Sequence, residues 1–347
     1  MAAAVSLGDA RKSLEYTISV PLHGVAAQQS VRQLALTMGF SIDASEEITL
    51  AVAELTSNLI KHAGRGTLLA RQIGAGERVG IEIEASDQGP GIGDIEKSFE
   101  DGYSTAGSLG YGLGTVNRAM DEVDISSAPD CGTQVTCRRW LRSEQRKSGR
   151  SAWEVGVVTR PRTGFRENGD AFVVKEWGDQ LLVGLIDGLG HGELAQKAAL
   201  AAQCYVQSHY DQPLDNIFLG AGRACRATRG VVMALARFHT TGQLEFASLG
   251  NIEVRVHSEP ERLPLTCKRG YLGVAEMNVK VQKFSWNPQW LLVLHTDGLR
   301  THWQWSDLPG IAQARSHSVA GTLMKQFASG QDDATVLAVR SRGPWPS

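Results

Sequence analysis

The sequence predicts a two-domain α+β protein, and three observations support that prediction. A length of 347 residues is enough for two domains, at roughly 150 residues each. Strand-like alternation and helical repeats of apolar residues occur along most of the chain. A charged stretch rich in serine and arginine, LRSEQRKSGRS, separates two such regions. We therefore expect one domain at residues 1–140 and another at 153–347, joined by a linker at 141–152.

The first domain is expected to mix strands and helices. LEYTISV, residues 14–20, alternates like a strand, and apolar residues then recur at helical spacing at about 23–39 and 43–63. Two strand-like runs follow, RGTLLARQI and RVGIEIEASD. A glycine-rich stretch at 89–114 precedes a helix at about 114–122, and closing strands lie near DISSA and TQVTCRRW. This order predicts a mixed α/β unit of about 140 residues.

Strands dominate the second domain. Two helices are expected from Glu193 to about Tyr210 and from about Leu214 to Thr228, and a third at about 311–328. Many strands with a few helices between them predict two sheets covered by helices. The strand-like runs, in chain order, are WEVGVVTR, DAFVVKEW, LLVGLID, VVMALARFH, QLEFASLG, IEVRVH, VKVQKF, WLLVLHTD and ATVLAVR.

Composition excludes several classes of function. Hydrophobic residues make up 42% of the chain, charged residues 21%, and the net charge is -2. A chain without a basic excess lacks the field that holds proteins on nucleic acids or anionic lipids, so we expect neither partner. Five cysteines form no CxxC pair, a pattern typical of reduced thiols. No leader peptide or apolar run of membrane length is evident. We expect a cytoplasmic protein.

A polar helix face in the first domain is a candidate catalytic element. Glu54, Asn58 and His62 are spaced four residues apart, so a helix would present all three on one face. Such a string by itself is more often a solvated face. A glycine-rich stretch downstream favours the catalytic interpretation. His62 is left without a role, because a helix histidine beside a site more often forms a hydrogen bond than accepts a phosphoryl group.

Two glycine-rich segments lie downstream of that helix. Asp87 ends a strand-like run, and its carboxylate could accept a hydrogen bond from an exocyclic amine while the glycines after it let the backbone approach a flat ring. The second segment directly precedes a helix, where backbone N–H groups can cradle phosphates. No GxxxxGK[ST] motif occurs, which argues against a P-loop. The glycines concerned are Gly89, Gly91 and Gly93, then Gly107, Gly110, Gly112 and Gly114.

Residues 15–140 resemble the GHKL (Bergerat) ATP-binding fold, and within it the bacterial serine kinases of the RsbT/RsbW group. The resemblance rests on ELTSNLIKH, SDQGPGIGD, GYSTAGSLGYGLGTVNRAMDE and GTQVTCRRW, in that order. It implies an α/β sandwich, with ATP and Mg²⁺ as cofactors. By the same resemblance Glu54 would be the base for the acceptor hydroxyl, Asn58 would hold Mg²⁺ and Asp87 would recognise adenine. The glycines implied are Gly89 and Gly91 flanking the base, and Gly110, Gly112 and Gly114 in a lid over the phosphates.

Four aspartates in the second domain stand at the ends of strand-like runs: Asp170, Asp187, Asp297 and Asp332. An aspartate beside glycine at such a position is commonly a turn former. Four together favour a different interpretation, because several carboxylates in one place repel unless cations lie between them. Oxygen ligands of this kind suit Mg²⁺ and Mn²⁺. The pattern therefore predicts a divalent metal site.

Residues 153–341 resemble the metal-dependent PP2C-type serine/threonine phosphatases, particularly the SpoIIE/RsbX branch. The resemblance rests on DGLGHG, HTDG and DDATVL, and it implies an α-β-β-α sandwich. Asp187 would bridge two Mn²⁺ or Mg²⁺ ions beside the Gly188 carbonyl. Asp170, Asp297 and Asp332 would complete the metal shell, with Asp333 as a less certain neighbour.

The sequence departs from that family beside the first aspartate. Larger PP2C enzymes place a phosphate-binding arginine five residues before it and an acidic residue directly before it. In this chain Arg166 lies four residues before Asp170, and Gly169 is adjacent. The contacts to substrate phosphate are therefore open. His191 and His295 flank motif aspartates, and we interpret both as structural residues because this chemistry does not require a histidine ligand.

Together the two resemblances imply a bifunctional bacterial signalling regulator. Its N-terminal domain would phosphorylate, and its C-terminal domain dephosphorylate, Ser/Thr on STAS-domain proteins of the anti-anti-sigma or stressosome type. The alternative is a phosphatase whose N-terminal domain is an ATP-gated docking or anti-sigma module without kinase turnover. A degenerate phosphatase that only binds phosphoproteins is a weaker third hypothesis. The identity of the substrate and the oligomeric state stay open.

Overall fold

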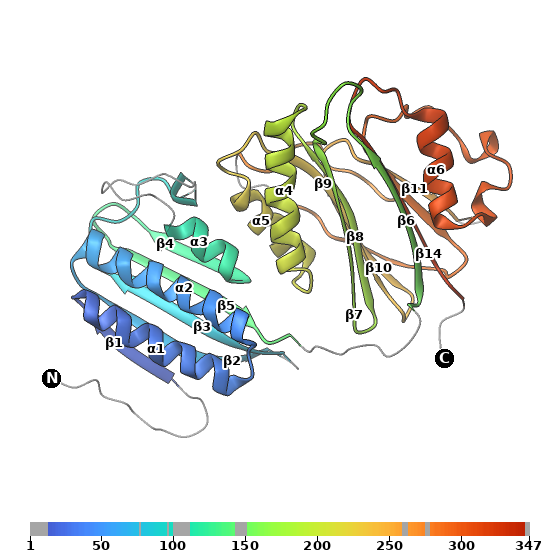
Figure 1. Ribbon diagram of the computed structural model, residues 1–347. Coiled ribbons are helices and arrows are strands. Elements are labelled where there is room, and N and C mark those ends of the chain that lie inside the picture. Colours follow the sequence, from blue (N-terminus) through green and yellow to red (C-terminus); the bar gives the residue numbers. More distant parts are fainter. Residues whose placement is uncertain are drawn as a thin grey trace. The chain divides into compact units, whose positions relative to one another are not determined.

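The computed structural model describes residues 13–75, 78–95, 97–99, 112–142, 151–258, 263–274 and 278–343 (Figure 1). The chain divides into two compact units, Met1–Ser143 and Glu144–Ser347. The division lies inside residues 141–152, the stretch that we propose as the linker. No helix in the described ranges is long and apolar enough to span a membrane.

The N-terminal unit is a five-stranded antiparallel sheet with helices on one face (Figure 1). The strand order is β1-β2-β3-β5-β4, with every neighbouring pair antiparallel. The strands are β1 Ser13–Ile18, β2 Gly66–Ala75, β3 Arg78–Asp87, β4 Glu122–Ser127 and β5 Thr133–Trp140. The helices are α1 Pro21–Met38, α2 Ile42–Asn58 and α3 Gly112–Ala119, with a π-helical turn at Leu59–Ala63 and a 3-10 turn at Lys97–Phe99.

Alternation along the strands gives this sheet an apolar face and a charged face. Ile81 and Ile83 of β3 are fully buried in the core shared with the helices. Glu82 lies between them and points to the other face, where its carboxylate accepts hydrogen bonds from Arg71 and Arg138 at 2.7 Å each. Burial alone would raise the pKa of Glu82, but these two guanidinium groups hold it below its ordinary value.

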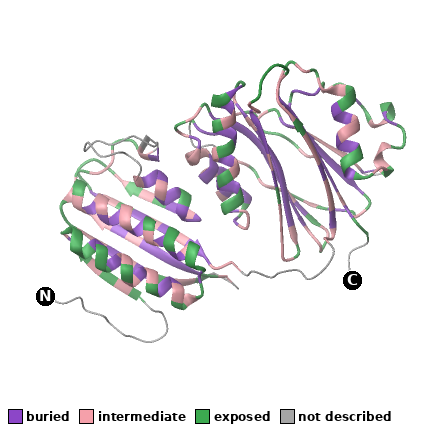
Figure 2. Ribbon diagram, in the orientation of Figure 1, coloured by how far each residue is buried: buried purple, intermediate pink, exposed green. Residues whose placement is uncertain are grey.

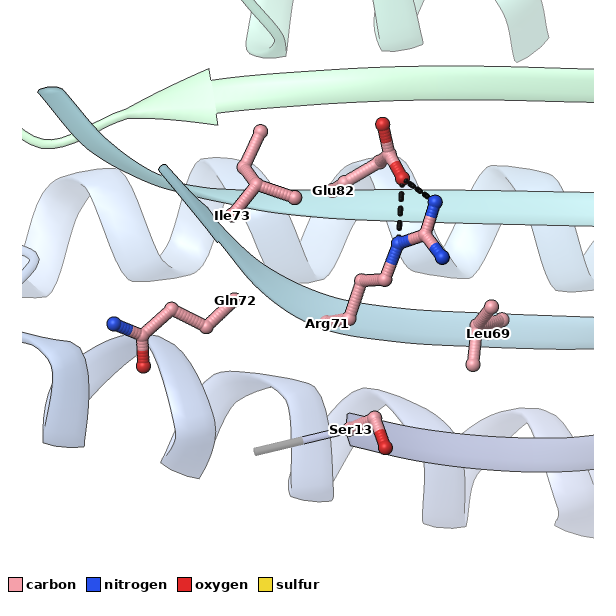
Figure 3. Close-up of a pocket in the computed structure, with 6 residues that line it drawn as sticks. All are labelled: Ser13, Leu69, Arg71, Gln72, Ile73 and Glu82. Carbon is pink, nitrogen blue, oxygen red and sulfur yellow. Dashed lines mark hydrogen bonds and ion pairs between the residues drawn. The ribbon is translucent and has the colours of Figure 1, made fainter. Parts of the chain in front are cut away.

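An open pocket of about 470 Å³ lies on this charged face (Figure 3). Its lining comes from β1, β2 and β3 and includes the Arg71–Glu82 ion pair. None of the residues that the sequence singles out for nucleotide chemistry lines it. The lining residues are Ser13, Leu69, Arg71, Gln72, Ile73 and Glu82.

The C-terminal unit is a four-layer α-β-β-α sandwich, which confirms the predicted architecture. One sheet has the order β12-β10-β9-β8-β7 and the other β11-β13-β14-β6. Figure 2 shows buried residues along the strands of both sheets. The strands are β6 Trp153–Arg160, β7 Asp170–Trp177, β8 Gln180–Gly188, β9 Val231–His239, β10 Gln243–Leu249, β11 Glu253–His257, β12 Gln282–Ser285, β13 Leu291–His295 and β14 Ala334–Ser341. The helices are α4 Glu193–Ser208, α5 Leu214–Ala224 and α6 Ser316–Phe327, with 3-10 turns at Trp305–Asp307 and Ile311–Gln313.

Three apolar clusters hold these layers together. α4 and α5 pack on the outer face of the first sheet, and Ala202 and Phe218 are fully buried there. Between the sheets lies a second cluster that includes Trp153 and Phe238, whose ring centroids are 5.1 Å apart. α6 covers the outer face of the second sheet. The helix predicted at about 311–328 therefore begins later than expected, because residues 311–313 form a separate 3-10 turn.

The first turn of α6 approaches β6 unusually closely. A Cβ atom added at Gly156 would lie 2.2 Å from the backbone nitrogen of His317. The Ser316 backbone N–H donates a hydrogen bond of 2.7 Å to the Glu154 carboxylate, and the Ser316 hydroxyl donates one of 3.0 Å to the Glu154 carbonyl. Only glycine at position 156 leaves room for this contact.

We expect Gly156→Ala to lower the free energy of unfolding of the C-terminal unit by about 1–3 kcal/mol, because the added methyl group overpacks the contact between α6 and β6. Gly321→Ala is the matched control within α6. Its added carbon meets no atom within 4 Å, so it should stabilise the unit by about 0.5–1 kcal/mol through helix propensity. Hydrogen exchange of α6 and β6 peptides along a urea titration measures both. Equal effects from the two substitutions would contradict the close contact.

Candidate functional sites

Glu54 and Asn58 lie on the face of α2 that meets the first residue of α3. A Cβ atom placed on Gly112 would lie 3.3 Å from Asn58 Nδ2 and 3.6 Å from Glu54 Oε2. Both side chains are half-buried. The structure thus brings a carboxylate, a carboxamide and the first residue of α3 together. The four-residue spacing predicts the shared face of Glu54 and Asn58, but not the position of α3.

The helix that carries these residues changes form directly after Asn58. Leu59–Ala63 is a π-helical turn that ends at Gly64, whose φ is +71°. Sequence periodicity predicts one continuous α-helix across this region. The apolar residues keep α-helical spacing, so the pattern does not reveal the wider π-helical turn. π-Helical turns occur frequently at functional sites. His62 lies in this turn and is exposed.

Asp87 is held rigidly at the end of β3. Its Oδ1 accepts hydrogen bonds from the backbone N–H groups of Gly89, at 2.8 Å, and Thr133, at 3.2 Å. Its Oδ2 accepts no hydrogen bond from the described residues. The carboxylate is half-buried, so one oxygen is fixed by the backbone while the other can accept from a bound N–H group.

Gly89 and Gly91 let the loop after β3 pack closely against other segments. Gly91 has a φ of +77°, and a Cβ there would lie 2.1 Å from the Ala128 carbonyl oxygen. A Cβ on Gly89 would lie 2.9 Å from Ala63 Cβ, in the π-helical turn. Ser127 adds a contact that the sequence does not flag, since its Oγ accepts a hydrogen bond of 2.8 Å from the Ile92 N–H.

The glycines expected in the lid are only partly visible. Gly112 begins α3, and Gly114 is buried within its first turn. Gly110 lies outside the described residues. The structure therefore places the start of α3 beside Glu54 and Asn58, and the lid role of the three glycines stays a prediction.

Antiparallel pairing places two of the predicted metal ligands opposite each other in the C-terminal unit. Asp170, at the start of β7, pairs in register with Asp187, near the end of β8. The Thr296 hydroxyl, just past β13 in the other sheet, donates a hydrogen bond of 2.8 Å to Asp170 Oδ2. Thr296 also binds the β14 end, because its Oγ1 accepts from the Thr335 N–H at 2.9 Å. The start of β7 and the end of β8 in one sheet therefore meet the end of β13 and the start of β14 in the other sheet at these aspartates.

The electrostatics show that the carboxylates share one environment. Burial, followed by the charges of the neighbouring aspartates, raises the pKa of Asp187 to about 9. The contributing neighbours are Asp170, Asp297, Asp332 and Asp333. Burial also raises the pKa of Asp170 to about 7, although hydrogen bonds from Thr296 and Thr335 oppose the shift. Asp170 and Asp187 are therefore costly to ionise at this place in the fold.

Asp333 has a structural role that the sequence leaves uncertain. It is buried, and its two carboxylate oxygens accept hydrogen bonds from the backbone N–H groups of Arg162, at 2.8 Å, and Gly169, at 2.9 Å. These bonds fasten the segment before β7. The Gly169 carbonyl in turn accepts a hydrogen bond of 3.0 Å from the Gly188 N–H. Gly188, the predicted carbonyl ligand, is thereby tied to the same segment.

The donor set fits hard divalent cations. Asp170 Oδ1 is buried and has no hydrogen-bond partner, which leaves it available as a ligand, and carboxylate oxygens are the ligands that Mg²⁺ and Mn²⁺ prefer. Within the described ranges no three His, Cys, Asp or Glu side chains converge closely enough to enclose a metal ion.

Two further predicted ligands, Asp297 and Asp332, are more exposed than Asp170. Asp297 is exposed and accepts a hydrogen bond of 2.8 Å from Asn251 Nδ2. Asp332 is half-buried, and its Oδ1 accepts from the Asp333 N–H at 2.9 Å. Asn251 is a second residue that the sequence does not flag, because a single asparagine after a strand carries no distinctive spacing.

The structure supports a structural role for His295. It is fully buried, and burial lowers its pKa. Its Nδ1 lies 3.0 Å from the Thr296 carbonyl, while its Nε2 accepts a hydrogen bond of 3.4 Å from the Trp303 indole. His191 is exposed, and its ring packs edge-on against Phe165 with centroids 5.1 Å apart.

Comparison with known proteins assigns the N-terminal unit. Residues 21–139 match the family described as histidine kinase-like ATPase domain. The chain is 43% identical over 118 residues to the serine/threonine-protein kinase RsbT of Bacillus subtilis (strain 168), an alignment covering 34% of this chain and 89% of RsbT. The chain belongs to the histidine kinase-like ATPase family. Its N-terminal part is an RsbT-like domain.

The C-terminal unit matches a second family. Residues 178–342 match stage II sporulation protein E (SpoIIE). The chain is 25% identical over 182 residues to the phosphoserine phosphatase RsbX of Bacillus subtilis (strain 168), covering 49% of this chain and 85% of RsbX. A solved structure described as "The bacterial stressosome: a modular system that has been adapted to control secondary messenger signaling" is 29% identical, with a TM-score of 0.52 over 55% of this chain and 100% of its own. Both predicted resemblances are confirmed: the chain joins an RsbT-like domain to a SpoIIE-like domain with the PP2C phosphatase fold.

The raised pKa values predict how stability depends on pH in the metal-free chain. The folded state holds a proton on Asp187 up to about pH 9, whereas the unfolded state releases it near the ordinary value of 3.8. Between these limits the folded state binds more protons, so the free energy of unfolding should fall as pH rises. We expect Asp187→Asn to remove this part of the slope.

Urea unfolding with a chelator present, repeated across this pH range for the wild type and Asp187→Asn, measures the difference. Mg²⁺ or Mn²⁺ should stabilise the wild type more at high pH than at low pH, because cations bind the deprotonated carboxylates. Identical pH slopes for the two proteins would contradict the shared electrostatic environment of the aspartates.

Proposed function

We propose that this chain is a bifunctional signalling regulator that both phosphorylates and dephosphorylates Ser/Thr on STAS-domain proteins. The observation that carries the proposal is the presence, in one chain, of a domain related to a serine/threonine kinase and a domain related to a phosphoserine phosphatase. Glu54 and Asn58 beside Gly112 in the first domain, and Asp170 paired with Asp187 in the second, support the proposal.

In the RsbT-like domain, Glu54 would accept the proton of the acceptor hydroxyl as the γ-phosphoryl group passes from ATP to the serine oxygen and ADP leaves. Asn58, on the next turn of the same helix, would hold the Mg²⁺ ion that neutralises phosphate charge. Asp87 Oδ2 would accept from the exocyclic amine of adenine. Backbone N–H groups at the start of α3 would contact phosphate oxygens. The proximity of Glu54, Asn58 and Gly112 supports this assignment.

In the SpoIIE-like domain, the aspartates would hold two Mn²⁺ or Mg²⁺ ions. Asp187 and the Gly188 carbonyl, together with Asp170, Asp297 and Asp332, are the residues that would hold them. Bound divalent cations supply a water of lowered pKa and stabilise charge on the phosphoryl group. The Thr296 hydroxyl orients Asp170. Water attacks phosphorus and the bond from phosphorus to the serine oxygen breaks. The products are an unmodified serine side chain in the substrate protein and inorganic phosphate.

The expected partner follows from the same relatives. The kinase RsbT and the phosphatase RsbX support a place in sigma-factor partner switching, and the stressosome structure supports a partner of that assembly type. Opposing enzymes in one chain would both act on a docked target at high effective concentration. The phosphorylation state of the target would then depend on which domain is active.

We expect a phosphoryl group to accumulate on a STAS-domain partner incubated with Mg-ATP and the Asp187→Asn chain, in which dephosphorylation is blocked. Intact-mass spectrometry of the partner measures it. The phosphate should disappear on later addition of the wild type. In the double variant Glu54→Ala/Asp187→Asn, transfer should fall by about 10²–10⁴-fold, the usual loss for a missing base, while ATP still binds.

The same experiment separates the alternative. If the partner and ATP both bind but no phosphate appears, the RsbT-like domain is an ATP-gated docking module and the chain is a phosphatase only. Equal transfer with and without Glu54 would remove that residue from the mechanism.

The metal role of Asp187 has a separate test. We expect Asp187→Asn to lower Mn²⁺-dependent hydrolysis of p-nitrophenyl phosphate by at least about 10²-fold, because the ions lose the carboxylate proposed to join them. Asp179→Asn is the matched control, since Asp179 lies in the turn at the opposite end of the β7–β8 hairpin. Unchanged hydrolysis by Asp187→Asn, or an equal loss in the control, would defeat the assignment.

A further inference from the structure

Arg229 lies beside the turn that follows Asp187. Strands β8 and β9 pair so that Gly188 lies opposite Val231. Beyond that pair, the Leu189 N–H donates a hydrogen bond of 3.0 Å to the Gly230 carbonyl. This bond fixes the backbone next to Arg229 against the turn.

The guanidinium group itself packs on this turn. A Cβ atom added at Gly190 would lie 2.9 Å from Arg229 Nη1. Gly190 has a φ of +91°, a conformation that favours glycine. Because glycine has no side chain, the Arg229 guanidinium can pack directly against the backbone at this position. Gly190 is only three residues after Asp187, which places a positive charge close to the proposed metal site.

The N–H donors of Arg229 are not used by the described residues. It is exposed and makes no hydrogen bond or ion pair with any described residue. By contrast, Arg226 Nη1 donates a hydrogen bond of 2.7 Å to the Val274 carbonyl. The Arg162 guanidinium lies over the Phe165 ring, 5.4 Å from its centroid. Arg229 therefore keeps its N–H groups available for a ligand.

A phosphate monoester needs such a group at this site. The substrate is anionic, and the surrounding carboxylates repel it wherever cations do not neutralise them. A guanidinium fork binds two phosphoryl oxygens at once and carries a permanent positive charge. Arg166, the arginine nearest in sequence to Asp170, is exposed on the segment before β7, and no residue in the described part of the chain fixes it beside the aspartates.

We propose that Arg229 binds the phosphoryl group of the substrate in the SpoIIE-like domain, in the role that position alone would assign to Arg166. The inference rests on the proposed phosphatase function. Because the arginine comes from the loop before β9, it would approach the phosphoryl group from the side of the turn after Asp187.

The test uses the full chain with Mn²⁺ and compares Arg229→Ala, Arg229→Lys and Arg166→Ala. For Arg229→Ala we expect kcat/KM for p-nitrophenyl phosphate to fall about tenfold to a hundredfold, the usual loss for a charge-assisted hydrogen-bonded pair. The inhibition constant of inorganic phosphate should rise in parallel. Arg229→Lys should recover part of the loss, and Arg166→Ala should stay within about twofold of the wild type.

Binding of inorganic phosphate, measured by calorimetry with Mn²⁺ present, keeps the inference separate from catalysis. Weaker phosphate binding by Arg229→Ala at an unchanged unfolding midpoint supports a ligand contact and excludes a purely structural role. An active wild type whose kinetics and phosphate binding are unaffected by Arg229→Ala overturns the inference and leaves the phosphatase intact. A wild type that binds phosphate through Arg229 without hydrolysing esters overturns the proposed function instead.

Discussion

Mutual repulsion among carboxylates at the edge of two sheets is the constraint on which the C-terminal unit depends. Burial and neighbouring charge make Asp170 and Asp187 costly to ionise, and the chain holds them with hydrogen bonds across the sandwich. Asp170 is bound from the other sheet by Thr296. A one-residue slip of β7 against β8 would turn one of the paired aspartates to the other face. The correct register of β7 against β8 is therefore needed both for folding of the sheet and for bringing the two aspartates together.

The candidate site of the N-terminal unit is held differently, with fewer carboxylates close to one another. Its catalytic candidates lie on a helix face, and its adenine candidate, Asp87, is held by two backbone N–H groups rather than by a charged partner. Ion pairs occur on both faces of this sheet. Glu82 pairs with Arg71 and Arg138 on one face. Arg139 pairs with Asp121 and with Glu47 of α2 on the helix side.

Sequence patterns predict most of the framework and the acidic ligands, and the failures have identifiable causes. Alternation and helical spacing are direct consequences of burial, so the sheets and the long helices follow from them. Thr296 and Ser127 could not be predicted, because hydroxyl residues are common in turns and their partners are distant in sequence. The π-helical turn after Asn58 and the 3-10 turn before α6 have the apolar spacing of ordinary helix. The role of Asp333 depends on backbone N–H groups that no side-chain pattern reveals.

The hydrogen bond from Thr296 to Asp170 joins the two sheets at the proposed metal site, and this has a consequence for the lifetime of the protein. Cations bound between aspartates of both sheets would hold the sheets together, and they would have to dissociate before the sandwich could open. Local opening is what exposes a chain to proteases. Divalent metal bound there would therefore slow local opening of this domain, and with it the attack of proteases.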